Sequence, residues 1–146
     1  MSGFLLDTNV TSELIRLRPD PAVSEWVFNQ ERETLFLSVI TIGELRKGFA
    51  ILPQGKRRAD LEQWLDQSLL PSFAGRVLPV TQSIAESWGI LSGGRHLGGR
   101  PLAMADGLIA ATALDHGLMV VTRNVRDFLD LGVTLLNPWD IEPLPQ

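Results

Sequence analysis

The chain contains four acidic residues whose surroundings would direct a side chain toward a ligand instead of toward solvent. They are Asp7, Glu44, Asp106 and Asp127. A carboxylate in an apolar setting is unfavourable unless a cation or hydrogen-bond donors compensate its charge. Several converging oxygen ligands favour a hard divalent cation such as Mg²⁺ or Mn²⁺. These residue types therefore predict a metal site, and the elements around them must bring the four acids together.

Asp7 directly follows the apolar run Phe4–Leu6 and precedes Thr8 and Asn9. The run is typical of a buried strand, and a helix is expected from about Val10. One interpretation is that Asp7 or Thr8 only caps this helix. We favour Asp7 as a ligand, because open parallel sheets bind ligands at the carboxyl ends of their strands. Thr8 and Asn9 are then available to cap the helix.

Asp106 is the only charged residue between positions 101 and 114. The segment predicts a helix, and the face that carries Asp106 continues with Ile109, Ala110 and Ala113. An aspartate with a purely structural role would lack an obvious partner on that face. Asp106 is therefore the clearest single candidate for a metal ligand.

Glu44 allows two interpretations. The sequence Thr41-Ile42-Gly43-Glu44 fits a capping box at the start of a helix over about 42–51, in which Glu44 reaches back to the Thr41 amide. A glutamate in a first helical turn also points toward the edge of the sheet. The segment by itself leaves capping and metal binding open.

The segment after the apolar run at 118–121 supplies a hydroxyl, an amide and a carboxylate, from Thr122, Asn124 and Asp127. A turn with Thr122 or Asn124 as a helix N-cap is the alternative interpretation. Because the run predicts a strand, this segment is expected at the same sheet edge as Asp7.

Four arginines are candidates for contacts with a phosphate backbone. Arg123 and Arg126 lie in the segment just described, and Arg95 and Arg100 lie in the glycine-rich stretch 92–101. This stretch lacks the ordered glycine, lysine and Ser/Thr pattern of a P-loop, and we expect it to be a flexible loop. Arg123 and Arg126 could also simply flank a solvated turn.

Composition narrows the possible chemistry. The chain has no cysteine, which excludes disulfides, thiolate catalysis and cysteine-ligated zinc. Only two histidines, His96 and His116, are present, fewer than a zinc enzyme usually needs. The formal charge of −4 argues against a protein that coats nucleic acid. It does not argue against a nuclease, because a bound metal reverses the local sign of charge.

The order of the predicted elements indicates an α/β fold with a mostly parallel central sheet, arranged as a three-layer α/β/α sandwich. Strands are expected at 4–6, 34–39, 76–80, 118–121 and 133–136. Helices are expected at 10–17, 22–29, 42–51, 56–70, from about 84 to 91, at 102–114 and at 125–131. No repeat, linker or break in composition divides the sequence, so we expect a single domain over residues 1–146. With neither a membrane-spanning stretch nor a secretory signal in the sequence, we expect a cytoplasmic protein without a membrane partner.

Four motifs together resemble the PIN-domain family, and are most similar to the VapC-type toxin ribonucleases of VapBC toxin–antitoxin pairs. The resemblance extends from Asp7 to Trp139, nearly the whole chain. Its motifs are Leu5-Leu6-Asp7-Thr8-Asn9, Thr41-Ile42-Gly43-Glu44-Leu45, Ala105-Asp106-Gly107-Leu108-Ile109-Ala110-Ala111-Thr112-Ala113 and Thr122-Arg123-Asn124, with a terminal Asn137-Pro138-Trp139. No single motif is decisive, but four in this order with similar spacing are specific.

The resemblance implies an α/β/α fold, Mg²⁺- or Mn²⁺-dependent endoribonuclease activity, and a homodimer held inactive by a small cognate antitoxin. It places Asp7, Glu44 and Asp106 at the acidic positions of the family. Many relatives carry aspartate where this chain has Asn124, which leaves the roles of Asn124 and Asp127 open.

The mechanism implied for the family has Asp7 and Asp106 hold a first metal, directly or through water. Glu44 then holds a second metal or orients the nucleophile. Thr8, Asn9 and Thr122, together with Asn124, are expected to position water or phosphate. The metal activates water for attack on a phosphodiester of RNA. By family analogy, the products carry a 5′-phosphate and a 3′-hydroxyl.

Two other classes of function remain open from the sequence. In a haloacid-dehalogenase-like phosphohydrolase, Asp7 would be a covalent nucleophile. Such enzymes usually carry a second aspartate two residues later, where this chain has Asn9. The other class is a non-catalytic binding module with a degenerate site. The motifs do not distinguish RNA from DNA, because that discrimination depends on shape and on contacts to the 2′-hydroxyl.

Overall fold

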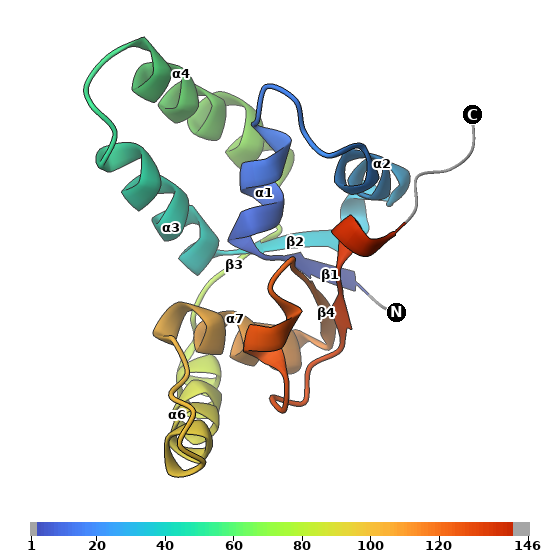
Figure 1. The fold of residues 1–146 in the computed structure, drawn as a ribbon, viewed down its shortest axis with the longest axis vertical. Coiled ribbons are helices and arrows are strands. Elements are labelled where there is room, and N and C mark those ends of the chain that lie inside the picture. The colour runs from blue at the N-terminus through green and yellow to red at the C-terminus, as the bar shows by residue number, and fades with distance from the viewer. Residues whose placement is uncertain (1–2, 142–146) are drawn as a thin grey trace.

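A computed structural model describes residues 3–141 and contains one five-stranded sheet in which every strand pair is parallel. The strand order is β3-β2-β1-β4-β5. The strands are β1 Gly3–Leu6, β2 Leu35–Ser38, β3 Val77–Leu78, β4 Leu118–Val121 and β5 Leu135–Leu136. This order puts β1 and β4 in the centre of the sheet, side by side (Figure 1).

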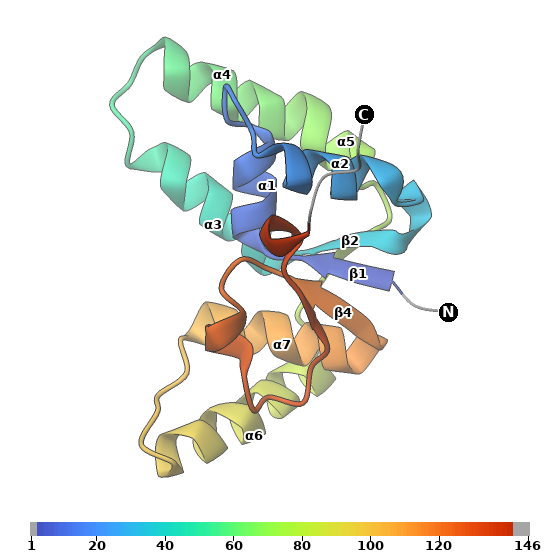
Figure 2. The same cartoon turned by 45° about the vertical axis from the view of Figure 1, so that its right-hand side comes forward.

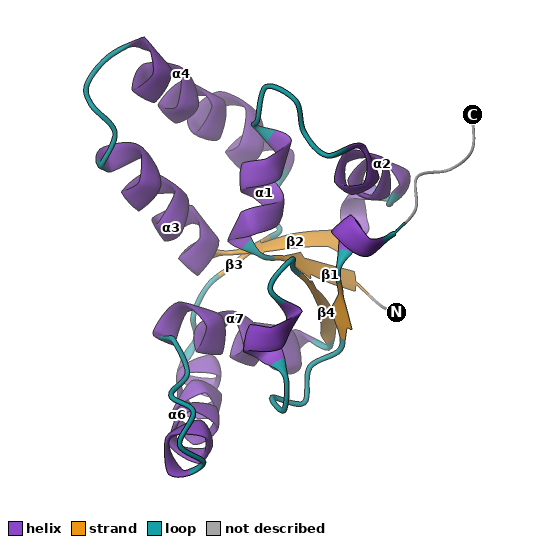
Figure 3. Cartoon of the chain, viewed as in Figure 1, coloured by secondary structure: helices purple, strands orange, loops and turns teal. Residues whose placement is uncertain are grey.

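Helices cover both faces of the sheet (Figures 1 and 3). The α-helices are α1 Thr8–Leu14, α2 Pro21–Asn29, α3 Val39–Ala50, α4 Lys56–Trp64, α5 Leu70–Ser72, α6 Gln82–Leu97 and α7 Met104–His116. The shorter helical segments are the 3₁₀ turns η1 Arg32–Thr34, η3 Val125–Phe128 and η4 Pro138–Asp140, and the π-helical turn η2 Leu65–Leu69 between α4 and α5. Figure 2 shows α1 to α5 on one face and α6 and α7 on the other. The three-layer prediction is confirmed.

The strands alternate their side chains between two cores. Leu6 and Val121 face the core that packs against α1 to α5. Leu5 and Val120 face the second core, which α7 completes with Ile109. All five side chains are at most 1% exposed, as expected for strands buried on both faces. None of the helices within residues 3–141 is both long and apolar enough to cross a membrane.

The prediction that residues 92–101 form a flexible loop was wrong for most of that stretch. Helix α6 continues to Leu97, and only residues 98–103 are irregular. The glycines that misled the prediction, Gly93 and Gly94, lie on the outer face of the helix with nothing near them. The positive charge of Arg95 in the last turn stabilises α6, because it lies at the negative end of the helix dipole.

Several helices begin earlier than predicted, and the starts of α3 and α1 bear on the site. Helix α3 begins at Val39 and is capped by Ser38, whose Oγ accepts a hydrogen bond from the amide of Ile40 at 3.0 Å. Thr41 is therefore inside the helix, and the predicted capping box with Glu44 does not form. Helix α1 begins at Thr8, directly after Asp7.

Candidate active site

The candidate site lies at the boundary between β1 and β4, from which successive strands are added to the sheet in opposite directions. Strand β1 has β2 on one side and β4 on the other, so the connections after β1 and β4 lead away from each other. Such a switch point leaves a crevice at the carboxyl ends of the strands. Asp7 comes directly after β1 and Thr122 directly after β4. The sheet topology therefore brings these two residues together.

An open cleft of about 500 Å³ occupies this crevice. Three of the four predicted acids line it: Asp7, Glu44 from the second turn of α3, and Asp106 from the first turn of α7. Its other lining residues are Thr8, Asn9, Ser12, Glu13, Arg16, Arg123, Asn124 and Trp139. Asp127 is exposed and does not line the cleft.

Asp7 is held by three hydrogen bonds. Its Oδ1 accepts from the Thr8 amide at 2.8 Å, and its Oδ2 accepts from Thr122 Oγ1 at 2.8 Å and from Asn9 Nδ2 at 3.3 Å. Asp7 therefore caps α1 itself, and the expectation that Thr8 or Asn9 would cap this helix was wrong. Burial raises the pKa of Asp7, the bonds from Thr122 and Thr8 oppose that effect, and the charges of Glu44 and Asp127 add to it.

Thr122 is fully buried, and its hydroxyl joins three segments. Besides donating to Asp7, Thr122 Oγ1 accepts from Asn9 Nδ2 at 3.2 Å and from the Asn124 amide at 3.0 Å. A side chain with no exposed surface does not touch a substrate. The structure thus revises the role predicted for Thr122: it orients the Asp7 carboxylate.

Glu44 contacts the same network from the other side. Its Oε1 accepts a hydrogen bond from Thr8 Oγ1 at 2.6 Å, and Thr8 Oγ1 is also 3.3 Å from Thr41 Oγ1. Glu44 is exposed and lines the cleft, and its second carboxylate oxygen accepts no side-chain or backbone hydrogen bond within residues 3–141. Since the capping box is absent, this contact with Thr8 is what orients Glu44.

Asp106 is half-buried in the first turn of α7 and makes no capping hydrogen bond. Burial, together with the charges of Asp7, Asp127 and Glu44, raises the pKa of Asp106 to about 6, and the charge of Arg95 opposes this shift. These carboxylates repel one another across the cleft. Asp127 contributes to this field from outside the cleft, whereas Asn124 lines it.

The arginines predicted to contact a phosphate backbone differ in their surroundings. Arg95 donates through Nε to the carbonyl of Arg100 at 3.1 Å, and Arg100 pairs with Asp130 at 3.0 Å. Both therefore direct donors to their own chain. Arg126 is exposed, and Arg123 lines the cleft.

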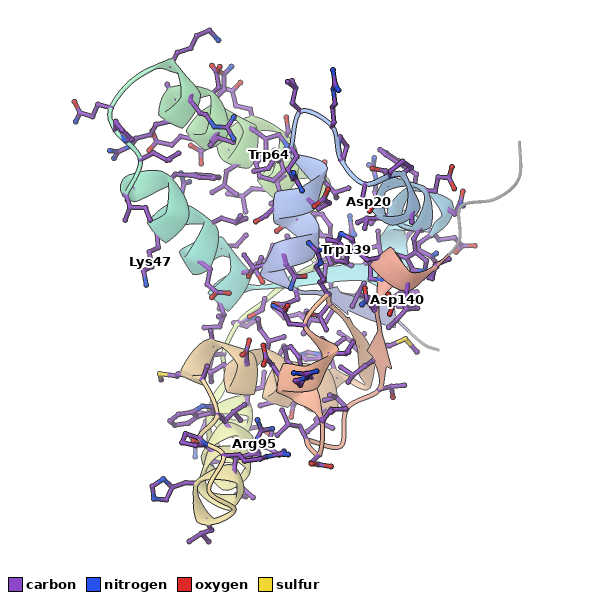
Figure 4. All side chains as sticks on the ribbon, in the orientation of Figure 1. Asp20, Lys47, Trp64, Arg95, Trp139 and Asp140 are labelled. Atoms are coloured by element: carbon purple, nitrogen blue, oxygen red, sulfur yellow. The ribbon has the colours of Figure 1, made fainter. Side chains whose placement is uncertain are left out.

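Trp139 is a cleft residue whose position the sequence did not predict. The Arg123 guanidinium lies over its ring, 5.2 Å from the centroid. The Trp139 amide donates to Asn137 Oδ1 at 2.9 Å, and Asn137 Nδ2 lies 3.5 Å from the Arg123 carbonyl. The Asn-Pro-Trp segment thus contacts the Thr-Arg-Asn segment, and Trp139 is drawn between α1 and η4 in the view of Figure 4.

Glu13 and Arg16 are two further cleft residues that sequence reasoning missed. Glu13 is only 4% exposed, and its Oε2 accepts from the Asp20 amide at 2.8 Å while its Oε1 pairs with Arg16 at 3.2 Å. It joins the end of α1 to the start of α2. Asn9 and Arg16 share the helical face of Glu13, so no local pattern in the sequence indicated that role.

The donor set of the cleft suits a hard divalent cation. Asp7, Glu44 and Asp106 offer carboxylate oxygens, and none of them takes part in an ion pair within residues 3–141. Within the same residues, no three Asp, Glu, His or Cys side chains are grouped closely enough to enclose a metal. Mg²⁺ usually keeps several water ligands and takes only one or two carboxylates from the protein. One or two of these carboxylates, together with water, would be enough to hold such a cation.

Comparisons with known proteins agree with this architecture. The PIN domain profile matches residues 4–133. The chain is 46% identical over 136 residues to "VapC ribonuclease Y4jK" of Sinorhizobium fredii, covering 93% of this chain and 97% of that protein. The crystal structure of FitAcB from Neisseria gonorrhoeae has a TM-score of 0.88 at 42% identity, covering 94% and 99%. DNA-bound VapBC from Salmonella typhimurium has a TM-score of 0.73 at 26% identity, covering 94% and 99%.

Proposed function

Because the chain belongs to the PIN domain family, we propose that it is a Mg²⁺- or Mn²⁺-dependent endoribonuclease that acts as the toxin of a toxin–antitoxin pair. The observation that carries this proposal is the meeting of Asp7, Glu44 and Asp106 in one open cleft at the switch point of the sheet. Family membership supports the nuclease class, and the name of the relative from Sinorhizobium fredii supports RNA as the substrate. The cytoplasm is the expected place of action.

We assign the following roles to the residues of the cleft. Asp7 and Asp106 would hold the cation, and Glu44 would hold a second cation or orient the attacking water. When bound, the cation lowers the pKa of water and stabilises the charge that develops on the phosphate. Thr122 keeps Asp7 oriented, and Thr8 does the same for Glu44.

The polar and basic residues at the edge of the cleft would bind the substrate. Asn124 lines the cleft and can hold water or phosphate, with Asn9 beside it. Arg123 lies on Trp139 with its backbone amide 3.3 Å from Asn9 Oδ1, so its guanidinium is available to a backbone phosphate. Arg126 is the exposed candidate for a second phosphate contact.

The geometry weakens the phosphohydrolase alternative. A nucleophilic aspartate needs a free oxygen that faces its substrate. Asp7 is 5% exposed, and both its oxygens accept hydrogen bonds. Asn9, at the position where a second aspartate would act as acid and base, instead donates to Asp7. The arrangement suits a carboxylate that holds a cation better than one that attacks.

Removal of divalent metal tests the nuclease proposal. The purified protein is expected to cleave structured RNA with Mg²⁺ or Mn²⁺, to lose at least about 100-fold in rate with chelator, and to recover when Mn²⁺ is added in excess. Gel analysis of labelled RNA measures this, and matched DNA tests the substrate class. Cleavage that persists in chelator would contradict metal dependence, and the absence of any cleavage would favour a non-catalytic binding module.

We further propose that an antitoxin binds a groove of about 590 Å³ between α1, α2 and α4. The groove is lined largely by apolar side chains, including Phe28, which is 82% exposed in the free chain, and Trp64. An exposed aromatic beside an apolar groove is typical of helix-in-groove recognition. The solved relatives are toxin–antitoxin complexes, which supports this class of partner.

Phe28→Asp is expected to weaken binding of the cognate antitoxin by about 10- to 100-fold, because a charge would enter an apolar contact. Titration calorimetry with the purified antitoxin measures this. RNA cleavage by the free variant should be unchanged. Unaltered antitoxin affinity would place the partner elsewhere. The toxin is also proposed to be a homodimer, which sedimentation analysis of the chain alone will test.

A further inference from the structure

The position of Asp106 depends on where α7 begins, and the start of α7 lacks the usual support. Ala103 occupies the N-cap and provides no side-chain hydrogen bond. A helix end without a capping side chain leaves its first amides unsatisfied and tends to fray. Asp106 lies in this first turn, so contacts from outside α7 must hold its carboxylate in the cleft.

Helix α6 provides the first of these contacts, directly beside Asp106. A Cβ built on Gly107 would lie 2.7 Å from Trp88 Cδ1, 3.0 Å from Trp88 Nε1 and 2.9 Å from Leu102 Cδ2. The indole ring of α6 thus packs against the backbone of α7 at a distance that only glycine allows. Trp88 Nε1 is buried and has no hydrogen-bond partner within residues 3–141. A buried donor without an acceptor is unfavourable, so hydrogen bonding does not explain the position of this ring, whereas its packing against Gly107 does.

Arg95 provides the second contact. Its Nη1 donates to the carbonyl of Leu129 at 3.0 Å and its Nε to the carbonyl of Arg100 at 3.1 Å. The Arg100 amide donates back to the Arg95 carbonyl at 3.0 Å. Arg95 therefore connects three segments: α6, the irregular residues 98–103 that lead into α7, and the end of η3. The side chain extends from α6 in Figure 4.

We propose that Trp88 and Arg95 are positioning residues that together fix the Asp106 carboxylate in the cleft. This rests on the proposed nuclease function, and it reassigns Arg95 from a contact with the RNA backbone to a support of the site. The planar guanidinium matches two carbonyls in fixed directions, which the single ammonium of a lysine does not reproduce. Arg95 contacts this stretch at Arg100, and Trp88 contacts it at Gly107.

Arg95→Lys distinguishes a positioning role from a contact with the RNA backbone. Lysine keeps the positive charge but lacks the planar guanidinium that donates to the carbonyls of Arg100 and Leu129. The proposal expects kcat for RNA cleavage to fall about 10- to 100-fold, with KM and the salt dependence of binding unchanged within about twofold. In metal-free protein, hydrogen exchange at the amides of Arg100 and Gly107 should accelerate at least about 10-fold, since both are hydrogen-bonded in the wild type. Arg126→Ala, at an exposed arginine, should leave exchange at both amides unchanged.

An RNA contact would give the opposite pattern. Arg95→Ala would then raise KM and reduce the salt slope by about 1, with kcat and amide exchange unchanged in either Arg95 variant. That result would overturn the proposal. Because the exchange measurement needs neither RNA nor metal, it remains decisive even if the wild-type chain cleaves no RNA. Failure of the proposed function and failure of this inference are thereby distinguished.

Gly107→Ala tests the contact with Trp88. The added methyl group should push α7 away from the ring and lower kcat at least about 10-fold. Trp88→Ala, which removes the ring itself, should lower kcat to a similar extent with KM unchanged within about twofold. Gly48→Ala is the matched control, since Gly48 lies inside α3 with nothing within 4 Å, and alanine there should leave kcat unchanged. Wild-type kcat in Gly107→Ala or in Trp88→Ala would contradict the role of Trp88.

Discussion

Asp106→Asn is expected to lower RNA cleavage by at least about 1,000-fold and, at the same time, to make the metal-free protein more stable. The activity falls because an amide offers a cation a weaker, uncharged ligand, and the transition state loses the charge stabilisation that depends on it. Single-turnover cleavage of labelled RNA at saturating Mn²⁺ measures the loss. The structural change is small, because asparagine has nearly the same shape.

The gain in stability follows from the direction of the pKa shift. Burial, with the charges of Asp7, Asp127 and Glu44, raises the pKa of Asp106 to about 6 from its ordinary 3.8. Folding therefore favours the neutral carboxyl, and its stabilising contribution is present below pH 4 and is lost as the pH rises through 6. Asparagine is neutral at every pH. Since Asp106 is half-buried, we expect Asp106→Asn to raise the free energy of unfolding by about 1–3 kcal/mol at pH 8, which corresponds to a rise in Tm of roughly 2–10 °C.

Asp115→Asn is the matched control, because Asp115 lies near the other end of α7 and accepts a hydrogen bond from Ser83 Oγ at 2.9 Å that an amide oxygen can also accept. It should change neither cleavage nor the pH dependence of Tm. Mn²⁺ should raise the Tm of the wild type more than that of Asp106→Asn, because only the wild type offers the cation a negatively charged carboxylate at position 106. An Asp106→Asn protein that cleaves RNA at the wild-type rate, or that melts lower at pH 8, would contradict the assigned role.

The sequence was sufficient to predict the sheet because its strands carry a strong local signal. The runs Phe4–Leu6 and Met119–Val121 are apolar on both faces, as strands covered by helices must be. Glycine misled the prediction in α6, because its low helix propensity says nothing about the packing of α7 that stabilises this helix. Helix starts were also misplaced, since Ser38 and Asp7 compete with neighbouring polar residues for the same capping role.

The cleft was predictable where a residue stood alone and unpredictable where its role came from distant partners. Asp106 was identified because no local partner explains it. The hydroxyl of Thr122 orients an aspartate that lies 115 positions away, and no local pattern encodes that contact. Glu44 was ambiguous for a related reason: its carboxylate is held by Thr8, 36 positions away, and not by the Thr41 amide.

Asp7→Asn is expected to abolish RNA cleavage, by at least about 1,000-fold, in a protein that remains folded. Asparagine is as good an N-cap as aspartate, so the bond from the Thr8 amide and the start of α1 should survive. The bonds that Asp7 Oδ2 accepts from Thr122 and Asn9 are lost, because an amide nitrogen does not accept and the Thr122 hydroxyl already accepts two hydrogen bonds. Burial raises the pKa of Asp7, so removal of the charge also removes an unfavourable desolvation. Cleavage assays together with thermal melts in chelator measure both effects.

Asp20→Asn separates the charge of Asp7 from its capping role. Asp20 caps α2 in the way that Asp7 caps α1, with its Oδ1 2.9 Å from the Ala22 amide, but it does not line the cleft. If capping alone explained Asp7, both variants would show equally small effects on cleavage and on Tm. If the charge at the carboxyl end of β1 holds the cation, only Asp7→Asn will lose activity and the stabilisation by Mn²⁺. If Asp7→Asn still cleaves RNA, helix capping is sufficient to explain Asp7, and the proposed site loses its central ligand.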